Sequence, residues 1–312
     1  MFYNYNEYAI NPAFFYLRLM NTVPNLRGTG VAIITPFTSD NKVDFPAYGK
    51  VIEHLIANKV EYLVVLGTTG ETPVLTNPEK VDILNYTYTV VNNRVPVIVG
   101  IGGNDTADLI HDLTHFPLDK AAAILSASPY YNKPSQEGIF QHYKMVAAAS
   151  PKPIILYNVP GRTGRNMTAA TTLRIAREIP NIIGIKEASG DMGQCMEILR
   201  DAPAGFAVVS GDDALALPQI ACGMLGVISV AANAYPLEFG NMVRAALAHD
   251  FTTAKKINDT LIEAYDLMFV ENNPAGVKAF MTIQQLISNN LRMPNVPVGK
   301  ELYEKVKKYM SK

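Results

Sequence analysis

The chain has 312 residues, of which 48% are hydrophobic, and its formal net charge is −1 at pH 7. This allows one large domain with a sizeable core, and it gives no electrostatic reason to expect nucleic acid or an anionic membrane as a partner. The two cysteines, Cys195 and Cys222, stand alone, and no apolar stretch approaches the ~20 residues that span a bilayer; both features favour the reducing cytoplasm.

The N-terminal segment, residues 1–26, is rich in aromatic residues and carries no basic residue before Arg18. Its apolar run is too short for a secretory signal. We expect these residues to form an extension outside the fold, either disordered or absent if translation starts at Met20.

Eight short apolar runs follow, and each ends in glycine or polar residues. Six are rich in Val and Ile, which is typical of buried parallel strands. The runs are GVAIITPF, EYLVVLGTTGE, VPVIVGIGG, AAAILSASPYYN, PIILYNVPGRTG, NIIGIKEASG, FAVVSGDD and GVISVAAN. Segments with helical periodicity separate them. Asn77 before Pro78 predicts one helix N-cap, and Ser135 with Glu137 predicts the start of another helix.

This alternation of strand and helix predicts a (β/α)8 or TIM barrel over residues 27–235. Residues 236–312 carry three further helical patterns and no linker, so we expect a three-helix appendage packed on the barrel in the same domain. The patterns are FGNMVRAALAHD, TTAKKINDTLIEAYDLMFV and AGVKAFMTIQQLI. A doubly wound α/β sheet is the alternative, because Gly100, Gly102 and Gly103 follow a strand. The dinucleotide fingerprint needs a further glycine where Asp105 stands, and the barrel is therefore favoured.

Lys186 follows the apolar run Ile182–Ile185, at the strand end where a barrel carries its catalytic residues. Such a lysine is usually structural or solvated. Gly184 lies on the same face of this strand, and we expect it to leave space beside the amine. A neutral amine in a barrel mouth can attack a ketone and form a Schiff base, which makes an electron sink of the ketone.

Three other strand ends carry groups that suit this chemistry. Tyr157 ends the preceding strand and could reach Lys186 as a proton shuttle, although such a tyrosine is more often part of the core. Arg162 lies in a loop and has a planar fork that suits a carboxylate, although such an arginine is more often a surface charge. Thr68 and Thr69 lie in GTTGE, where hydroxyl and backbone N–H groups could hold a second carboxylate.

Three alternatives to a Schiff-base enzyme are a metal site, a nicotinamide oxidoreductase and a non-catalytic binding protein. His111 and His115 could share a helix face but have no evident third ligand, so we expect no metal site. A nicotinamide oxidoreductase would need a dinucleotide site. A non-catalytic keto-acid binding protein would not need the lysine, tyrosine and threonine that are all present.

The motifs GTTGE, SPYYNKPSQEG, LYNVPGRTG, IGIKEASG, SGDDA and GVISVAAN also resemble those of the dihydrodipicolinate synthase family, in the same order. The resemblance runs from about Gly28 to near the C-terminus. It implies a metal-free and cofactor-free class I lyase on a TIM barrel that condenses pyruvate with L-aspartate 4-semialdehyde on the diaminopimelate route to lysine. It also implies a homotetramer built as a dimer of tight dimers.

The resemblance assigns roles to individual residues. Lys186 matches the Schiff-base lysine and Tyr157 the general acid/base. Thr68 links Tyr157 to Tyr131, which in this family reaches in from a neighbouring subunit. The pyruvate carboxylate would be held by Thr69 and the adjacent backbone at Gly70, and the semialdehyde carboxylate by Arg162, with the backbones of Gly211 and Ile228 near the pocket.

Two further points follow from the resemblance. N-acetylneuraminate lyase and 2-keto-3-deoxy sugar-acid aldolases share the lysine and tyrosine but generally lack the Arg-Thr pair at Arg162, which favours the synthase. Lysine-inhibited members bind lysine at positions matching Thr72, Pro73, Asn77, Lys80, Asn104, Asp108 and Tyr130. They commonly have histidines at Asn77 and Lys80 and a glutamate at Asp108, so we expect weak inhibition or none.

Overall fold

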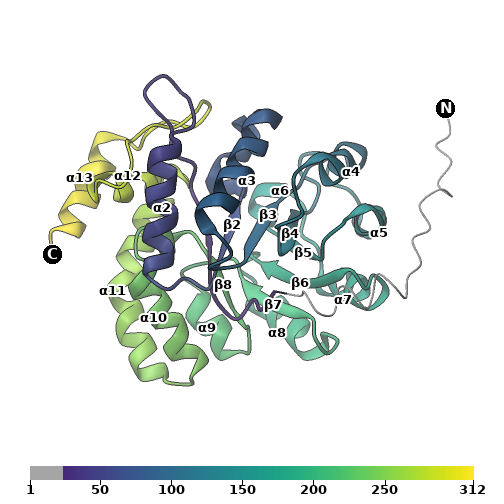
Figure 1. Cartoon of the computed structure of the whole chain (residues 1–312). Coiled ribbons are helices and arrows are strands. Elements are labelled where there is room, and N and C mark those ends of the chain that lie inside the picture. Colours follow the sequence, from purple (N-terminus) through teal and green to yellow (C-terminus); the bar gives the residue numbers. More distant parts are fainter. Residues whose placement is uncertain (1–23) are drawn as a thin grey trace.

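A computed structural model describes residues 24–312, in which eight parallel strands close into one barrel in chain order (Figure 1). The predicted TIM barrel is confirmed. Most of the predicted N-terminal extension lies outside the described residues, and its last residue, Leu26, is buried in the barrel interior. The strands are β1 Gly28–Ala32, β2 Tyr62–Val65, β3 Val97–Gly100, β4 Ala123–Ala127, β5 Ile154–Asn158, β6 Ile182–Glu187, β7 Ala207–Ser210 and β8 Gly226–Ser229.

Helices follow the strands and cover the outside of the barrel (Figure 1). They are α2 Phe45–Ala57, α3 Asn77–Val91, α4 Thr106–His115, α5 Gln136–Ala149, α6 Pro160–Thr163, α7 Ala169–Glu178, α8 Met192–Asp201, α9 Ala216–Ala221 and α10 Pro236–Leu247. Three short 3₁₀ turns lie at strand ends, namely η1 Thr68–Gly70, η2 Thr72–Val74 and η3 Ala231–Asn233.

The C-terminal appendage consists of α11 (Phe251–Phe269), α12 (Ala275–Ile283) and α13 (Lys300–Met310). Helix α11 packs against α10, and α12 and α13 pack against α11. The first helix expected after residue 235 is α10, which contacts β1 and β8 and so completes the outer ring. Helix α13 was not among the predicted helices. The appendage therefore has three helices, as predicted, but they are α11, α12 and α13 rather than α10, α11 and α12.

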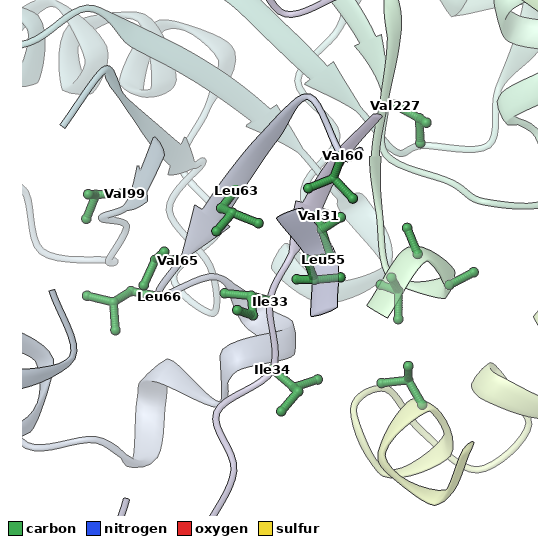
Figure 2. Packing of buried hydrophobic residues seen from close by; sticks show 14 of the residues in the cluster. Val31, Ile33, Ile34, Leu55, Val60, Leu63, Val65, Leu66, Val99 and Val227 are labelled. Atoms are coloured by element: carbon green, nitrogen blue, oxygen red, sulfur yellow. The ribbon is translucent and has the colours of Figure 1, made fainter. Parts of the chain in front are cut away.

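The core has two layers because successive strand residues point to opposite sides of a parallel sheet. Val31, Leu63, Val65 and Val99 point outward and pack beneath the helices (Figure 2). The alternate positions point into the barrel and fill it with a second cluster, which includes Ala32, Tyr62, Val64, Ile98, Ile155, Val209 and Ile228. A functional side chain at the top of the inner face therefore rests on a solid apolar floor.

The helix caps agree with the sequence in one case and correct it in another. The Ser135 hydroxyl accepts a hydrogen bond from the Gly138 N–H at 3.1 Å, so the predicted start of α5 is confirmed. The predicted cap at Asn77 is wrong by one residue. Thr76 caps α3 in a capping box with Glu79, and Asn77 is the first helical residue.

No helix within residues 24–312 is long and apolar enough to cross a membrane.

Candidate active site

Strands β5 and β6 place Tyr157 directly beside Lys186, since these two residues are partners in the parallel register. Lys186 is only 4% exposed. Its Nζ atom lies 4.3 Å from the centroid of the Tyr157 ring. The expected neighbours are therefore together, although the amine faces the tyrosine ring rather than its hydroxyl.

Gly184, which the sequence predicts to leave space beside the Lys186 amine, lies against the neighbouring strand β7. A Cβ atom at Gly184 would lie 2.5 Å from the backbone oxygen of Ala207, so this glycine allows β6 and β7 to approach each other. Gly211, just after β7, lies beside the Lys186 side chain. A Cβ there would lie 2.9 Å from Lys186 Cε, and the Gly211 N–H donates to the Glu187 carbonyl at 2.8 Å.

The outer face of the same two strands carries a buried polar network. Asn158 Nδ2 donates to both carboxylate oxygens of Glu187, at 3.2 and 3.0 Å, one residue beyond the Tyr157–Lys186 pair. Glu187 also accepts from the Ser189 N–H at 2.7 Å and from Gln194 Nε2 at 3.1 Å. Because a one-residue slip would bury these groups without partners, the network fixes the register that aligns Lys186 with Tyr157.

The turn η1, after β2, carries Thr68, Thr69 and Gly70. Thr69 is 2% exposed, and its hydroxyl oxygen accepts a hydrogen bond from Asn273 Nδ2 at 3.1 Å. The Gly70 carbonyl accepts from the Thr35 hydroxyl at 2.8 Å, which ties the turn to the chain after β1. The Asn273 amide donates to the Thr69 oxygen. The Thr69 hydroxyl can therefore donate its own proton to a bound anion.

Arg162 lies on the short helix α6, after β5, and its side chain is exposed. Its Nη2 atom is 3.5 Å from the Asn273 carbonyl oxygen, at the outer limit of a hydrogen bond. Asn273 therefore contacts both of the predicted carboxylate-binding elements. Sequence reasoning missed this residue, and the polar run Glu271–Asn273 before the last predicted helical pattern was the available signal.

The remaining predicted pocket residues lie at neighbouring strand ends. Ile228, on β8, is buried in the barrel interior. Asp213, two residues after the predicted pocket residue Gly211, is buried and accepts hydrogen bonds from the N–H groups of Val230 and Ala231 at 3.1 and 2.8 Å. Burial raises the pKa of the Asp213 carboxyl to about 6. This carboxyl joins the ends of β7 and β8.

Tyr131 is not part of the buried cluster. Its side chain is 87% exposed and its φ is 70°, a left-handed backbone conformation that is uncommon for an aromatic residue. No hydrogen bond joins the hydroxyls of Thr68, Tyr157 and Tyr131 within residues 24–312 of this single chain. The predicted relay is therefore not assembled in one subunit.

The positions matched to the lysine pocket lie on three successive segments beyond β2, β3 and β4. Thr72 and Pro73 belong to η2, and Asn77 and Lys80 to α3. Asn104 lies two residues before α4, Asp108 lies in the first turn of α4, and Tyr130 follows β4. The Lys80 ammonium donates to Asn77 Oδ1 at 3.0 Å. Two of the seven positions therefore bond to each other.

His111 and His115, the two histidines considered as metal ligands, are exposed on α4 with their ring centroids 3.8 Å apart. In the part of the chain that the structure describes, no group of three or more His, Cys, Asp or Glu side chains is arranged to hold a metal ion.

Comparisons with known proteins agree on one family. Residues 25–312 match the model of the dihydrodipicolinate synthetase family. The chain is 50% identical over 286 residues to the 4-hydroxy-tetrahydrodipicolinate synthase of Parabacteroides distasonis, which covers 92% of this chain and 96% of that protein.

Solved structures give the same result at the level of the fold. The dihydrodipicolinate synthase of Acinetobacter baumannii, solved in complex with pyruvate, superposes with a TM-score of 0.89 at 37% identity and covers 92% of this chain and 98% of that one. The enzyme of Cyanidioschyzon merolae, solved with lysine bound, gives 0.88 at 32% identity with the same coverage.

Proposed function

The chain belongs to the dihydrodipicolinate synthetase family, and from this premise we propose that it is a 4-hydroxy-tetrahydrodipicolinate synthase, a class I lyase that condenses pyruvate with L-aspartate 4-semialdehyde. The observation that carries the proposal is the buried Lys186 amine against the Tyr157 ring. An amine enclosed at the top of a barrel, next to a phenol, suits Schiff-base chemistry and proton transfer.

Lys186 is the proposed nucleophile. Its neutral amine attacks the pyruvate ketone, a C–N bond forms, and the carbonyl oxygen leaves as water after taking up protons. The resulting iminium draws electrons from the neighbouring methyl group, which loses a proton and becomes a carbon nucleophile. That carbon then attacks the aldehyde carbon of the second substrate. No external cofactor is required, because the iminium itself is the electron sink.

The proposed proton carrier is Tyr157, whose ring contacts the lysine amine. Its hydroxyl would protonate the departing oxygen and later the aldehyde oxygen. In the proposed assembly, Tyr131 of a neighbouring subunit and Thr68 extend this relay. The 87% exposure of Tyr131 supports the assembly, because an aromatic side chain held this far into solvent suits contact with a second subunit. We therefore propose a homotetramer.

Two carboxylates would be recognised at separate places. Thr69 and the Gly70 backbone, on the buried turn, suit the pyruvate carboxylate because it must lie close to Lys186. Arg162, on the exposed α6, suits the carboxylate of the larger second substrate. The two elements share one contact, Asn273, which touches the Thr69 hydroxyl and the Arg162 guanidinium.

Replacing Tyr157 with Phe tests the proton carrier. The change removes one hydroxyl, so the fold should be kept while kcat falls by about 10²–10⁴-fold. Tyr62→Phe is the matched control, because Tyr62 lies in the same barrel interior and its hydroxyl has no hydrogen-bond partner there. Steady-state kinetics of both variants give the answer, and near-normal turnover by Tyr157→Phe would reduce this residue to a packing role.

Replacing Arg162 with Ala tests the choice of second substrate. Loss of a charge-assisted hydrogen bond costs ~1.5–3 kcal/mol, so kcat/KM for the semialdehyde should fall roughly tenfold to a hundredfold while pyruvate binding is kept. Arg165→Ala is the control, since Arg165 is exposed nearby and donates to the Lys133 carbonyl. A wild-type enzyme that cleaves N-acetylneuraminate and ignores the semialdehyde would contradict the proposed function.

Titration with L-lysine tests the proposal of weak or absent feedback. The Lys80 ammonium bonds to Asn77, and a lysine ligand there would meet a like charge. At ~4 Å and an effective dielectric near 20 the repulsion is about 4 kcal/mol before screening. At saturating pyruvate we expect less than half inhibition at about 1 mM lysine, and Lys80→Met should increase the inhibition. Half inhibition of the wild type well below this concentration would reject the idea.

A further inference from the structure

The turn that carries Thr68 and Thr69 ends at Glu71, a buried residue with an unusual backbone. Its φ is 55°, which lies in the left-handed region that non-glycine residues rarely adopt. The Glu71 N–H donates to the Thr68 carbonyl at 3.0 Å, and its carbonyl accepts from the Val74 N–H at 3.0 Å. Glu71 is therefore the joint between η1 and η2, and its conformation determines where the two threonines point.

The side chain of Glu71 is held by the C-terminal part of the chain. Its Oε1 forms an ion pair with Lys278 Nζ at 2.5 Å, and both side chains have no exposed surface. Its Oε2 accepts from the Arg292 N–H at 3.2 Å. Lys278 also donates to the Asn290 carbonyl at 3.0 Å, and its ammonium lies 4.5 Å from the centroid of the Phe37 ring.

Net stability is a weak explanation for this ion pair. Two charges removed from water lose hydration, and their mutual attraction in a protein interior often does no more than offset that loss. Burial lowers the pKa of Lys278 to about 8, although the pairing with Glu71 acts in the opposite direction. The pair instead fixes the position of Glu71, because its Oε1 atom is held by one ammonium group on α12.

The same region of the appendage contacts the turn a second time. Asn273, two residues before α12, donates to the Thr69 hydroxyl, while Lys278 lies on α12 itself. The contacts reach both Thr69 and the joint at Glu71. A displacement of α12 would therefore move the Thr68 and Thr69 hydroxyls together.

We propose that Lys278 is a positioning residue that acts through Glu71 to hold the Thr68–Gly70 turn in the geometry that binds the keto-acid carboxylate. The inference rests on the proposed function of Thr69, and it makes the C-terminal appendage a working part of the active site. Lys278 itself touches no substrate.

The test is the steady-state kinetics of Lys278→Met with each substrate varied in turn. We expect KM for pyruvate to rise about tenfold or more, as for loss of a charge-assisted hydrogen bond. KM for the semialdehyde should change less, because in the described part of the chain Arg162 contacts this region only through the 3.5 Å contact with the Asn273 carbonyl oxygen. Arg244→Met is the control, because it also breaks an ion pair, between Arg244 and Glu61. Glu61 directly precedes β2, at the end of the barrel opposite to the Thr68–Gly70 turn. This variant should leave both KM values unchanged.

A double variant separates positioning from stability and keeps the test valid if Lys278→Met does not fold. Glu71→Gln with Lys278→Met removes both buried charges, so its thermal stability should return toward that of the wild type. If the pair positions the turn, KM for pyruvate stays raised in this stable protein. A double variant with wild-type stability and a wild-type KM for pyruvate would overturn the inference.

Thr69→Ala distinguishes the two possible failures. A raised KM for pyruvate in Thr69→Ala together with a normal value in the Lys278 variants rejects the positioning role alone. A normal KM for pyruvate in Thr69→Ala rejects the carboxylate-binding role of the turn, on which the inference depends.

Discussion

The parallel pairing of β5 with β6 is the constraint on which the candidate site depends. In this register Tyr157 lies beside Lys186 on the inner face, and Asn158 lies beside Glu187 on the outer face. Asn158 donates two buried hydrogen bonds to the Glu187 carboxylate, which a one-residue shift would leave unmade. The polar network outside the barrel thus maintains the alignment of the two groups inside it, and Gly184 allows the next strand to close against them.

Features governed by local pattern could be predicted from the sequence. Buried parallel strands read as Val- and Ile-rich runs, and the chemistry of a barrel lies where such runs end, so the strands and the Lys186–Tyr157 pair were predictable. The contact of Gly184 with β7 was not predicted, because a glycine's neighbour across a strand pair is not visible in one strand. Gly211, which lies beside the Lys186 side chain, comes from the following strand end.

Contacts between distant parts of the chain account for most of what was missed. Asn273 and Lys278 lie about two hundred residues after the turn that they hold, at separations of 204 and 207 residues. No periodicity or spacing relates such positions, and a buried lysine in a helical pattern resembles an ordinary surface lysine. The appendage therefore looked like a covering element, whereas its α12 end reaches the turn that we propose to bind the pyruvate carboxylate.

The proposal that most needs a direct test is that Lys186 is the nucleophile. Incubation with pyruvate and borohydride, followed by peptide mapping, would convert a Schiff base into a stable secondary amine on one lysine. The account predicts a single pyruvate-derived label on Lys186, and its loss in Lys186→Ala. Lys186 and Lys278 are the buried lysines of the described chain, so a label on Lys278, on a surface lysine or on no lysine at all would contradict the assignment.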